Sequence, residues 1–313
     1  MRLKQLLGPA LGLAFFLVFN SAVQAENAKS GRTVSFGNVG WSGFVRGGYV
    51  YQPKSDMENG GEFSADRLFV QGGVTYSPQI GRSVSLALGY GHDGYDFSGS
   101  SGFGALQPWS DINSYRISMP VMWGLDDKWI LFFIPTLRFT AESGADLGDA
   151  AQGGGFAGFS YRFSDRLTLG PGIAAVTQIE DSASVFPVIL IDWKITDRLS
   201  LSTGQGTGAT LGPGLALNWR ASRKWSFSLG GRYERLRFRL ADQGVAPKGV
   251  GEDRAFPLFG GINYTHNRRF QLALIGGFEL GGDLSLDDKG GNNIVKESYD
   301  PAPFIGLSFS LRL

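Results

Sequence analysis

Apolar and polar side chains alternate along most of this chain, and this period of two constrains the fold more than any other feature. From 305 to 313 every second residue is apolar, and the residues between them are glycine, serine or arginine. Successive side chains of a β-strand point to opposite faces, so this pattern predicts strands with one apolar face. Helical periodicity is rare after residue 26, which predicts an all-β fold. The same alternation recurs at 84–91, 115–123, 159–163, 215–220, 225–230 and 270–274.

The connections between the predicted strands alternate in length. An even count of about fourteen strands follows, with both chain ends on the side of the short turns. Twelve strands remain if the glycine-rich stretch at 199–210 forms no hairpin. About 21 residues for each strand with its connection leave room for the roughly 9–11 residues that cross a bilayer. Short turns are predicted at 77–82, 125–128, 164–166, 196–198, 222–224 and 267–269, and longer loops at 54–64, 98–108, 143–152, 179–183, 205–210, 241–253 and 282–299.

Aromatic side chains gather beside the short turns. Indole and phenol rings join an apolar body to a polar edge, so they favour the boundary between lipid and water. The alternative is that aromatic residues favour strands generally and flank turns by chance. Hydrocarbon also demands that every backbone N–H and C=O is paired, which an open sheet edge does not allow. The pattern therefore predicts an antiparallel up-and-down transmembrane β-barrel whose girdle contains Tyr76, Trp123, Trp129, Tyr161, Trp193, Trp219, Trp225 and Tyr264.

The first residues have the pattern of a secretory signal. Arg2 and Lys4 precede an apolar run at 11–19, and small residues before Ala25 offer a cleavage site. The run is short for a spanning helix, which needs about 20 residues, although an uncleaved anchor is the alternative. The expected organisation is a signal peptide at 1–25, a periplasmic lead-in or short plug at 26–40, and a barrel at 41–313.

Composition excludes several classes of function. The chain of 313 residues has no cysteine, two histidines and a formal net charge of +1. The absence of cysteine excludes a disulfide framework and a thiol nucleophile. A charge so close to zero argues against nucleic acid as a partner. With only His92 and His266 available, no zinc site and no cofactor are predicted.

The signal, the alternating strands, the turn-side aromatics and a strand at the last residue together resemble Gram-negative outer-membrane β-barrel proteins. The resemblance covers essentially the whole mature chain. The tract at 109–201, with Ile134-Pro135 and Asp-Arg turns at 165–166 and 197–198, resembles a group of uncharacterised outer-membrane barrels classed as a domain of unknown function. The resemblance implies an outer-membrane location in a Gram-negative bacterium, contact with lipid and lipopolysaccharide, and delivery by the barrel-assembly machinery.

The same resemblance implies that the last strand carries the assembly signal. In these proteins apolar residues alternate back from a terminal aromatic residue, usually phenylalanine. Here the chain ends in leucine, which departs from that pattern. The residues in the corresponding positions are Ile305, Leu307, Phe309, Leu311 and Leu313.

A passive diffusion channel for small solutes is the first function that such a barrel suggests. If the apolar residues face lipid, the polar face lines a lumen in which arginines outnumber acids. Arginine keeps its charge at ordinary pH, so a weak preference for anions is predicted. The alternative is that these charges pair with one another and close the lumen. The predicted lining residues are Arg46, Arg116, Arg138, Arg162, Arg220, Arg232, Asp93, Asp192, Glu234 and Glu279.

Two other functions compete with the channel. A lipid-modifying enzyme needs a nucleophile and a base at the membrane edge. His92 is the histidine near the outer rim, but strand parity places it on the lipid-facing side, and Asp93 and Gly94 follow it where lipid-hydrolysing barrels have a His-x-Ser pairing. No enzymatic activity is therefore expected. A closed structural or binding barrel is the other alternative. Its acidic loop at 283–300 has no calcium-loop spacing, so no metal site is predicted.

Overall fold

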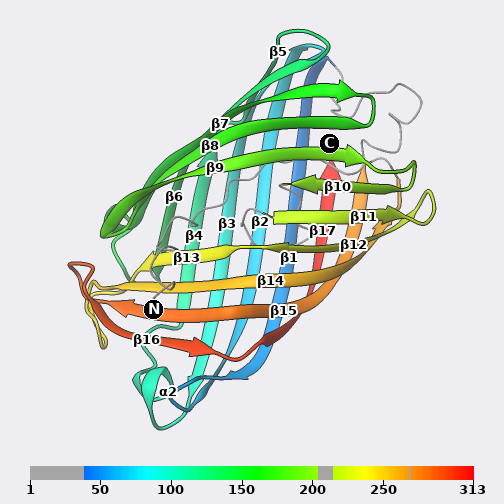
Figure 1. The fold of residues 1–313 in the computed structure, drawn as a ribbon. Coiled ribbons are helices and arrows are strands. Elements are labelled where there is room, and N and C mark those ends of the chain that lie inside the picture. Colours follow the sequence, from blue (N-terminus) through cyan, green and yellow to red (C-terminus); the bar gives the residue numbers. More distant parts are fainter. Residues whose placement is uncertain (1–38, 204–213, 268) are drawn as a thin grey trace, which may run out of the picture.

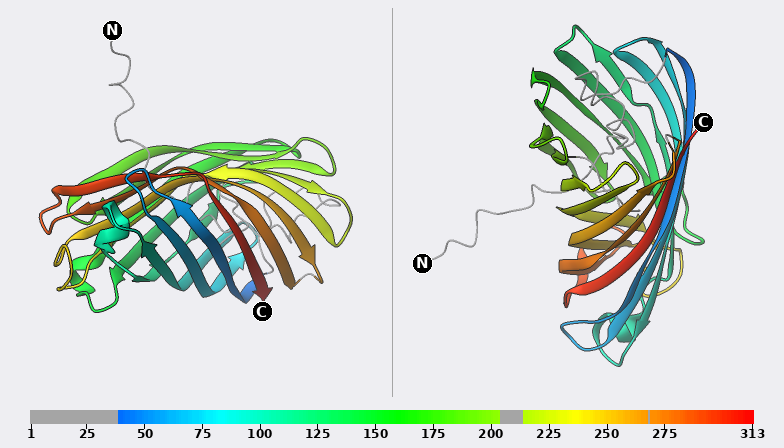
Figure 2. Two further views of the ribbon diagram at one scale, coloured as in Figure 1. Left: turned by 90° about the horizontal axis from the view of Figure 1, so that it is seen from below. Right: turned by 90° about the vertical axis from the view of Figure 1, so that its right-hand side faces the viewer.

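The strands form one antiparallel sheet that curves round on itself and closes (Figures 1 and 2). The computed structural model describes residues 39–203, 214–267 and 269–313. Closure is made by β1 (Gly40–Asp56), which pairs with both β2 (Glu62–Gln79) and β17 (Ala302–Arg312). The molecule is a closed barrel of 14 antiparallel strands, which confirms the predicted fold class and strand count. The alternative count of twelve is wrong.

The strand segments follow one another around the barrel in chain order. Among the described residues no helix is long and apolar enough to cross a membrane. The short helices are α2 (Gly102–Leu106) and the 3-10 turn η2 (Gly148–Ala150). The remaining segments are β3 (Arg82–Ser98), β4 (Asp111–Ser118), β5 (Val121–Gly124), β6 (Trp129–Glu142), β7 (Ala151–Ser164), β8 (Leu167–Gln178), β9 (Asp181–Lys194), β10 (Leu199–Thr203), β11 (Gly214–Arg220), β12 (Trp225–Arg232), β13 (Glu234–Arg239), β14 (Val250–Thr265), β15 (Phe270–Asp287) and β16 (Asn293–Tyr299).

Proline explains why fourteen strands contain a larger number of segments. Three strands are interrupted, between β4 and β5, between β12 and β13, and between β16 and β17, yet each keeps its register with the neighbouring strand. Pro120 and Pro301 lie in two of the gaps, and Pro257 of β14 lies opposite the third. Proline has no N–H for the ladder, so pairing lapses there without ending the strand.

The short turns lie at one end of the barrel, together with the start of β1 and the end of β17. The Leu313 N–H donates to the Gly43 carbonyl at 2.9 Å, which joins the two terminal strands at this end. In the turn between β5 and β6, the Asp126 carboxylate accepts the backbone N–H groups of Lys128 and Trp129, both at 2.7 Å. These hydrogen bonds lower the pKa of Asp126. The short turns predicted from the sequence are confirmed.

The opposite end corrects the sequence analysis in two places. The predicted loop at 282–299 is mostly strand, because β15 continues to Asp287 and β16 begins at Asn293. The predicted loop at 241–253 ends early, since β14 begins at Val250. In both places alternate apolar residues such as Leu284 and Leu286 are fully buried, and the charged residues between them obscured this alternation. The predicted loop at 205–210, the signal peptide at 1–25 and residues 26–38 lie outside the described residues.

The two faces of the wall differ as the alternation predicts. Outward side chains such as Leu229 and Ile189 are each 64% exposed, whereas inward neighbours such as Ser228 are buried. The predicted girdle residues lie on the outward face near the short turns. Some touch across strands: ring centroids are 4.7 Å apart for Trp129 and Tyr161 and 4.8 Å apart for Trp225 and Tyr264.

A second row of outward aromatics lies toward the loop end, and the sequence analysis missed it. Tyr49 and Tyr51 of β1, Tyr90 of β3 and Tyr115 of β4 are exposed on this side. Tyr90 and Tyr115 face each other in the ladder, with ring centroids 5.5 Å apart. An apolar band between two aromatic rows is the arrangement of a transmembrane barrel, with one row at each interface. The prediction of a single ring, on the turn side, was therefore incomplete.

Placing a charge on the outward apolar band tests this arrangement. We expect Leu229→Arg to lower the free energy of unfolding in lipid bilayers by about 2–4 kcal/mol, the cost of an arginine near the bilayer midplane of such barrels. The matched control is Val245→Arg, which places the same charge at an exposed apolar site in the loop between β13 and β14. Urea titration of refolded protein in vesicles measures both, and equal effects at the two sites would contradict the membrane-facing assignment.

Candidate functional site

The arginines predicted to line the barrel include three in one row of the inner wall, here called the arginine band: Arg46, Arg116 and Arg138. The row is continuous in the ladder, from Arg46 through Gln71 and Gly89 to Arg116, Arg138 and Gln152. The Arg46 Nε donates to Gln71 Oε1 at 2.7 Å, and Arg138 donates to Gln152 Oε1 through Nε at 3.0 Å and Nη2 at 2.6 Å. The row therefore concentrates positive charge at one level.

Three other predicted lining residues lie closer to the short turns. Arg162 of β7 and Asp192 of β9 share a row through Thr168 of β8. One Asp192 carboxylate oxygen is buried without a hydrogen-bond partner. Arg220 of β11 instead donates to the backbone carbonyl of Asp197 in the neighbouring turn. These residues do not form one site.

Above the arginine band lies an ionic cluster that the sequence analysis found only in part. Its centre is Arg67 of β2, which was not predicted and whose side chain is only 7% exposed. The guanidinium lies 3.1 Å from carboxylate oxygens of Asp253 and Glu279 and 3.9 Å from one of Asp93. Asp93 and Glu279 were predicted as lining residues, whereas Asp253 lies in the segment predicted to be a loop. The cluster joins β2 and β3 to β14 and β15 inside the barrel.

Hydrogen bonds complete the ionic cluster. The Tyr95 hydroxyl donates to Asp253 at 2.8 Å, and the Tyr299 hydroxyl lies 3.3 Å from Asp253 and 3.1 Å from Glu279. Gln52 accepts from Arg67 at 3.0 Å. Of the other predicted lining residues, Arg232 and Glu234 form an ion pair with each other. The alternative that charges pair within the lumen therefore holds at this level.

An aromatic cluster fills the barrel beyond these ions, toward the loops. Trp109 is its centre: its ring meets Phe97, Phe103 and Phe238 edge to face, with centroid distances of 5.6, 5.3 and 5.1 Å. Phe63 of β2 stacks beside Phe97 at 5.9 Å. All five are buried. This outer aromatic cluster therefore excludes water from one side of the opening at the loop end of the barrel, here called the mouth.

The strand segment β13 crosses the mouth of the barrel. Its last residue, Arg239, bridges in parallel to Ala141 at the end of β6, far around the wall. The Ala241 N–H donates to the Glu142 carboxylate at 2.9 Å. One face of β13 carries Phe238 into the aromatic cluster, and the other face carries arginines. The crossing therefore covers the opening between the β2–β3 wall and the β6–β9 wall.

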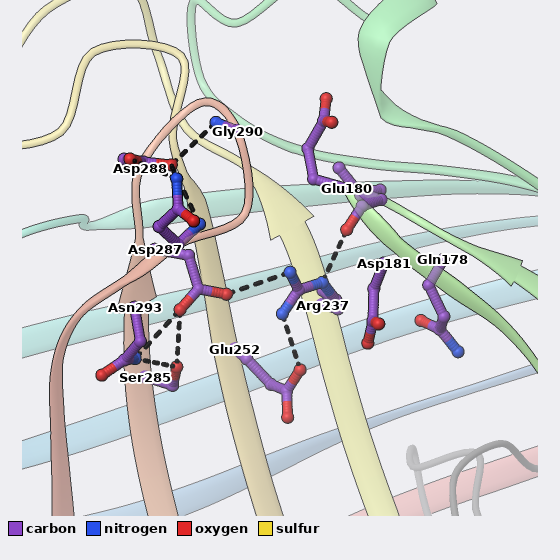
Figure 3. A network of polar contacts seen from close by, with 12 residues as sticks. Gln178, Glu180, Asp181, Arg237, Glu252, Ser285, Asp287, Asp288, Gly290 and Asn293 are labelled. Atoms are coloured by element: carbon purple, nitrogen blue, oxygen red, sulfur yellow. Dashed lines mark hydrogen bonds and ion pairs between the residues drawn. The ribbon is translucent and has the colours of Figure 1, made fainter.

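The arginine face of β13 binds the turn between β8 and β9 (Figure 3). Arg237 donates from Nε to the Ile179 carbonyl at 2.8 Å, and its other nitrogens lie 3.0 Å from Glu252 and from Asp287. Arg239 reaches the Glu180 carboxylate at 2.5 Å. The mouth is thus closed by aromatic packing on one side and by ion pairs on the other.

Two carboxylates stabilise the loops that neighbour this closure. Glu297 of β16 is buried and accepts the backbone N–H groups of Asn59 at 2.8 Å and Phe103 at 2.9 Å. Asp288, in the turn after β15, accepts the side chain and N–H of Asn292 and the N–H of Gly290. These bonds lower the pKa of Asp288 below its ordinary value. Both carboxylates are therefore structural anchors.

The inner wall also carries apolar side chains, which the sequence analysis did not predict. One cluster, toward the short turns, contains Phe132, Ile134, Phe156 and Phe186 on β6 to β9. A second cluster contains Val50, Ala216, Phe259, Ile275 and Phe304, of β1, β11, β14, β15 and β17. All of these are buried. The interior is thus polar only in separate layers.

The remaining sequence candidates form no reactive centre. His92 lies on the outward face of β3, with Nδ1 3.3 Å from the Asn113 side chain and Nε2 3.6 Å from Asp111. His266 lies in the turn after β14, beside Tyr264. Within 39–203, 214–267 and 269–313, no group of His, Asp and Glu side chains has the arrangement of a metal site.

Comparison with known proteins adds likenesses of fold. An outer-membrane channel from Pseudomonas putida F1 shares 10% identity and a TM-score of 0.48, covering 90% of this chain and 100% of its own. The toluene transporter TodX from P. putida has 11% identity and a TM-score of 0.45, covering 97% and 96%. A Pseudomonas aeruginosa FadL homologue has 11% identity and a TM-score of 0.41, covering 87% and 89%. No protein-family model and no curated protein matches the chain.

The geometry itself assigns the class of protein. A closed antiparallel barrel with an exposed apolar band, aromatic side chains on both sides of it and short turns at one end has the architecture of a transmembrane β-barrel of the outer-membrane type. Within the described residues its interior holds layers of charged side chains, and β13 covers its mouth.

Proposed function

We propose that this protein is an outer-membrane diffusion channel for small solutes with a weak preference for anions. The observation that carries the proposal is the arginine band, which places three guanidinium groups in one row of the inner wall. Rings of arginine favour anions in a pore because the charge persists at all ordinary pH values. Fourteen strands enclose more space than the eight whose side chains fill a barrel.

A closed structural or binding barrel is the second candidate, and the covered mouth favours it. In this case the ionic cluster around Arg67 and the outer aromatic cluster are permanent packing. We further propose export by the signal peptide at 1–25, assembly through the last strand, and contact with lipopolysaccharide at the outer rim. We also propose that the barrel is not an enzyme.

Ion selectivity tests the proposed function at the arginine band. We expect the reversal potential of the refolded protein under a salt gradient to indicate anion preference. Arg138→Gln removes one of the three charges, so the preference is expected to fall by roughly a third. Arg223→Gln, in the exposed turn between β11 and β12, is the matched control and should leave it unchanged. Cation selectivity of the parent protein, or equal effects of both variants, would contradict the proposal.

A further inference from the structure

The β13 segment differs from the other strands in how its two faces are held. Its inner face packs Phe238 against Trp109, an apolar contact that depends on shape. Its other face is held by ion pairs and hydrogen bonds, and the acidic partners Glu180 and Asp181 have side chains 38% and 44% exposed, so water and ions reach these contacts. The ionic side is therefore the side from which the mouth can be released.

The ionic contacts across the mouth are concentrated on one short turn. Arg237 binds the Ile179 carbonyl at 2.8 Å, Arg239 the Glu180 carboxylate at 2.5 Å, and Arg235 lies 3.4 Å from Asp181. Their partners are successive residues of the connection between β8 and β9. We call this set of contacts the mouth latch. It links β13 to the β8–β9 hairpin, from which β10 and β11 separate it in the order of strands around the barrel.

The turn that receives the latch is strained and closely approached. Glu180 has φ of +48°, a left-handed conformation that is unfavourable for a residue with a side chain. Gly291, at the tip of the β15–β16 hairpin, approaches the same turn so closely that an added Cβ would lie 2.4 Å from the Glu180 carbonyl oxygen. Both observations indicate a turn that is held in place by its contacts with the hairpins crossing the mouth.

The base of the crossing segment can bend. Pairing with β14 is interrupted at Arg232 and Tyr233, opposite Phe256 and Pro257. Beyond this point all six residues of β13 pair with β14, and Arg239 also bridges to β6. The interruption is the natural place for a hinge of the β13–β14 hairpin, because fewer backbone hydrogen bonds resist a bend there.

We propose that the mouth latch is a gate: breaking the contacts between β13 and the β8–β9 turn lets the β13–β14 hairpin swing from the opening and admits solutes. The physiological role of the gate rests on the proposed channel function, whereas the movement itself does not. Two of its three contacts, Arg239 with Glu180 and Arg235 with Asp181, are ion pairs, so high ionic strength should favour release. The latch closes the outer side, above the arginine band that we assign to selectivity.

Paired cysteines test the gate directly, since the natural chain has none. Glu180→Cys with Arg239→Cys removes the ion pair, and we expect open probability in planar bilayers to rise about tenfold, the change that corresponds to a loss of about 1.4 kcal/mol. A short bis-methanethiosulfonate reagent should then close the channel, and dithiothreitol should reopen it. The matched control is Lys54→Cys with Glu62→Cys, an ion pair within the β1–β2 hairpin that does not span the mouth.

A second measurement separates the gate from the channel function. Thr140→Cys lies buried on the inner wall beside the arginine band, below the mouth. In that background Glu180→Gln should speed its labelling by an external maleimide. Faster labelling without conductance in any variant would retain the gate and overturn the channel function. If breaking or cross-linking the latch changes neither the conductance nor the labelling rate, the gate is overturned.

Discussion

Replacing Arg67 by methionine is expected to cost about 3–5 kcal/mol of unfolding free energy, the usual effect of removing one partner from a buried ion pair. The guanidinium stands among the carboxylates of Asp93, Asp253 and Glu279, and its side chain is 7% exposed. Without it, like charges remain close together in a region that water reaches poorly. Urea titration of refolded protein, followed by tryptophan fluorescence, measures the loss.

A compensating variant separates charge from packing at Arg67. When Arg67→Met is combined with Asp93→Asn, Asp253→Asn and Glu279→Gln, the uncompensated charges disappear and most of the stability should return. The conservative Arg67→Lys keeps the charge but loses the planar fork, so an intermediate loss is expected. An Arg67→Met protein within about 1 kcal/mol of the parent would show that the cluster is hydrated and not part of a packed closure.

Phe238→Ala is expected to weaken the mouth more than any other single truncation on β13. The ring is fully buried and meets Trp109 at a centroid distance of 5.1 Å. Removing a buried phenylalanine side chain costs about 3–5 kcal/mol, and here the loss falls on the contact between β13 and Trp109, in the segment between α2 and β4. The effect should appear as a longer open time and as faster labelling of Thr140→Cys.

The control for Phe238 is Phe163→Ala, which truncates an exposed ring on the outward face near a short turn. It should leave the open time and the labelling rate of Thr140→Cys unchanged, because the Phe163 ring has no contact with the mouth. If Phe238→Ala instead unfolds the whole barrel without opening it first, the aromatic cluster is part of the barrel core and the mouth has no independent motion.

The barrel was predictable because its signal is local. Alternation within one strand determines which face is apolar, and the short turns between such strands determine which strands pair. The structure of a segment such as 225–230 is therefore predictable without knowledge of the other strands. The outward tyrosines near the loop end were missed for the opposite reason. Tyr90 and Tyr115 lie far apart in the sequence, and only the register of the sheet places them opposite each other, with Tyr49 two residues nearer the loops.

The mouth was not predictable because its partners are distant and its strands are charged. The segment at 234–239 alternates arginine with apolar residues, and 250–254 is mostly acidic or small, so the region from 241 to 253 resembles a solvated loop. Arg239 and Glu180 are separated by 59 positions, and no local pattern indicates that they meet. Arg67 likewise lies beside Asp66 in a strand with irregular alternation, which hid its inward direction.

Single-channel recording of residues 26–313 in a planar bilayer, under a salt gradient, tests the central claim most directly. The account predicts infrequent discrete openings with a reversal potential toward anions, and more frequent openings when Glu180 and Arg239 are both replaced. A steady cation-selective conductance would contradict the assignment of the arginine band. A barrel that remains silent even with the mouth latch removed would show that it is a closed structural protein and not a channel.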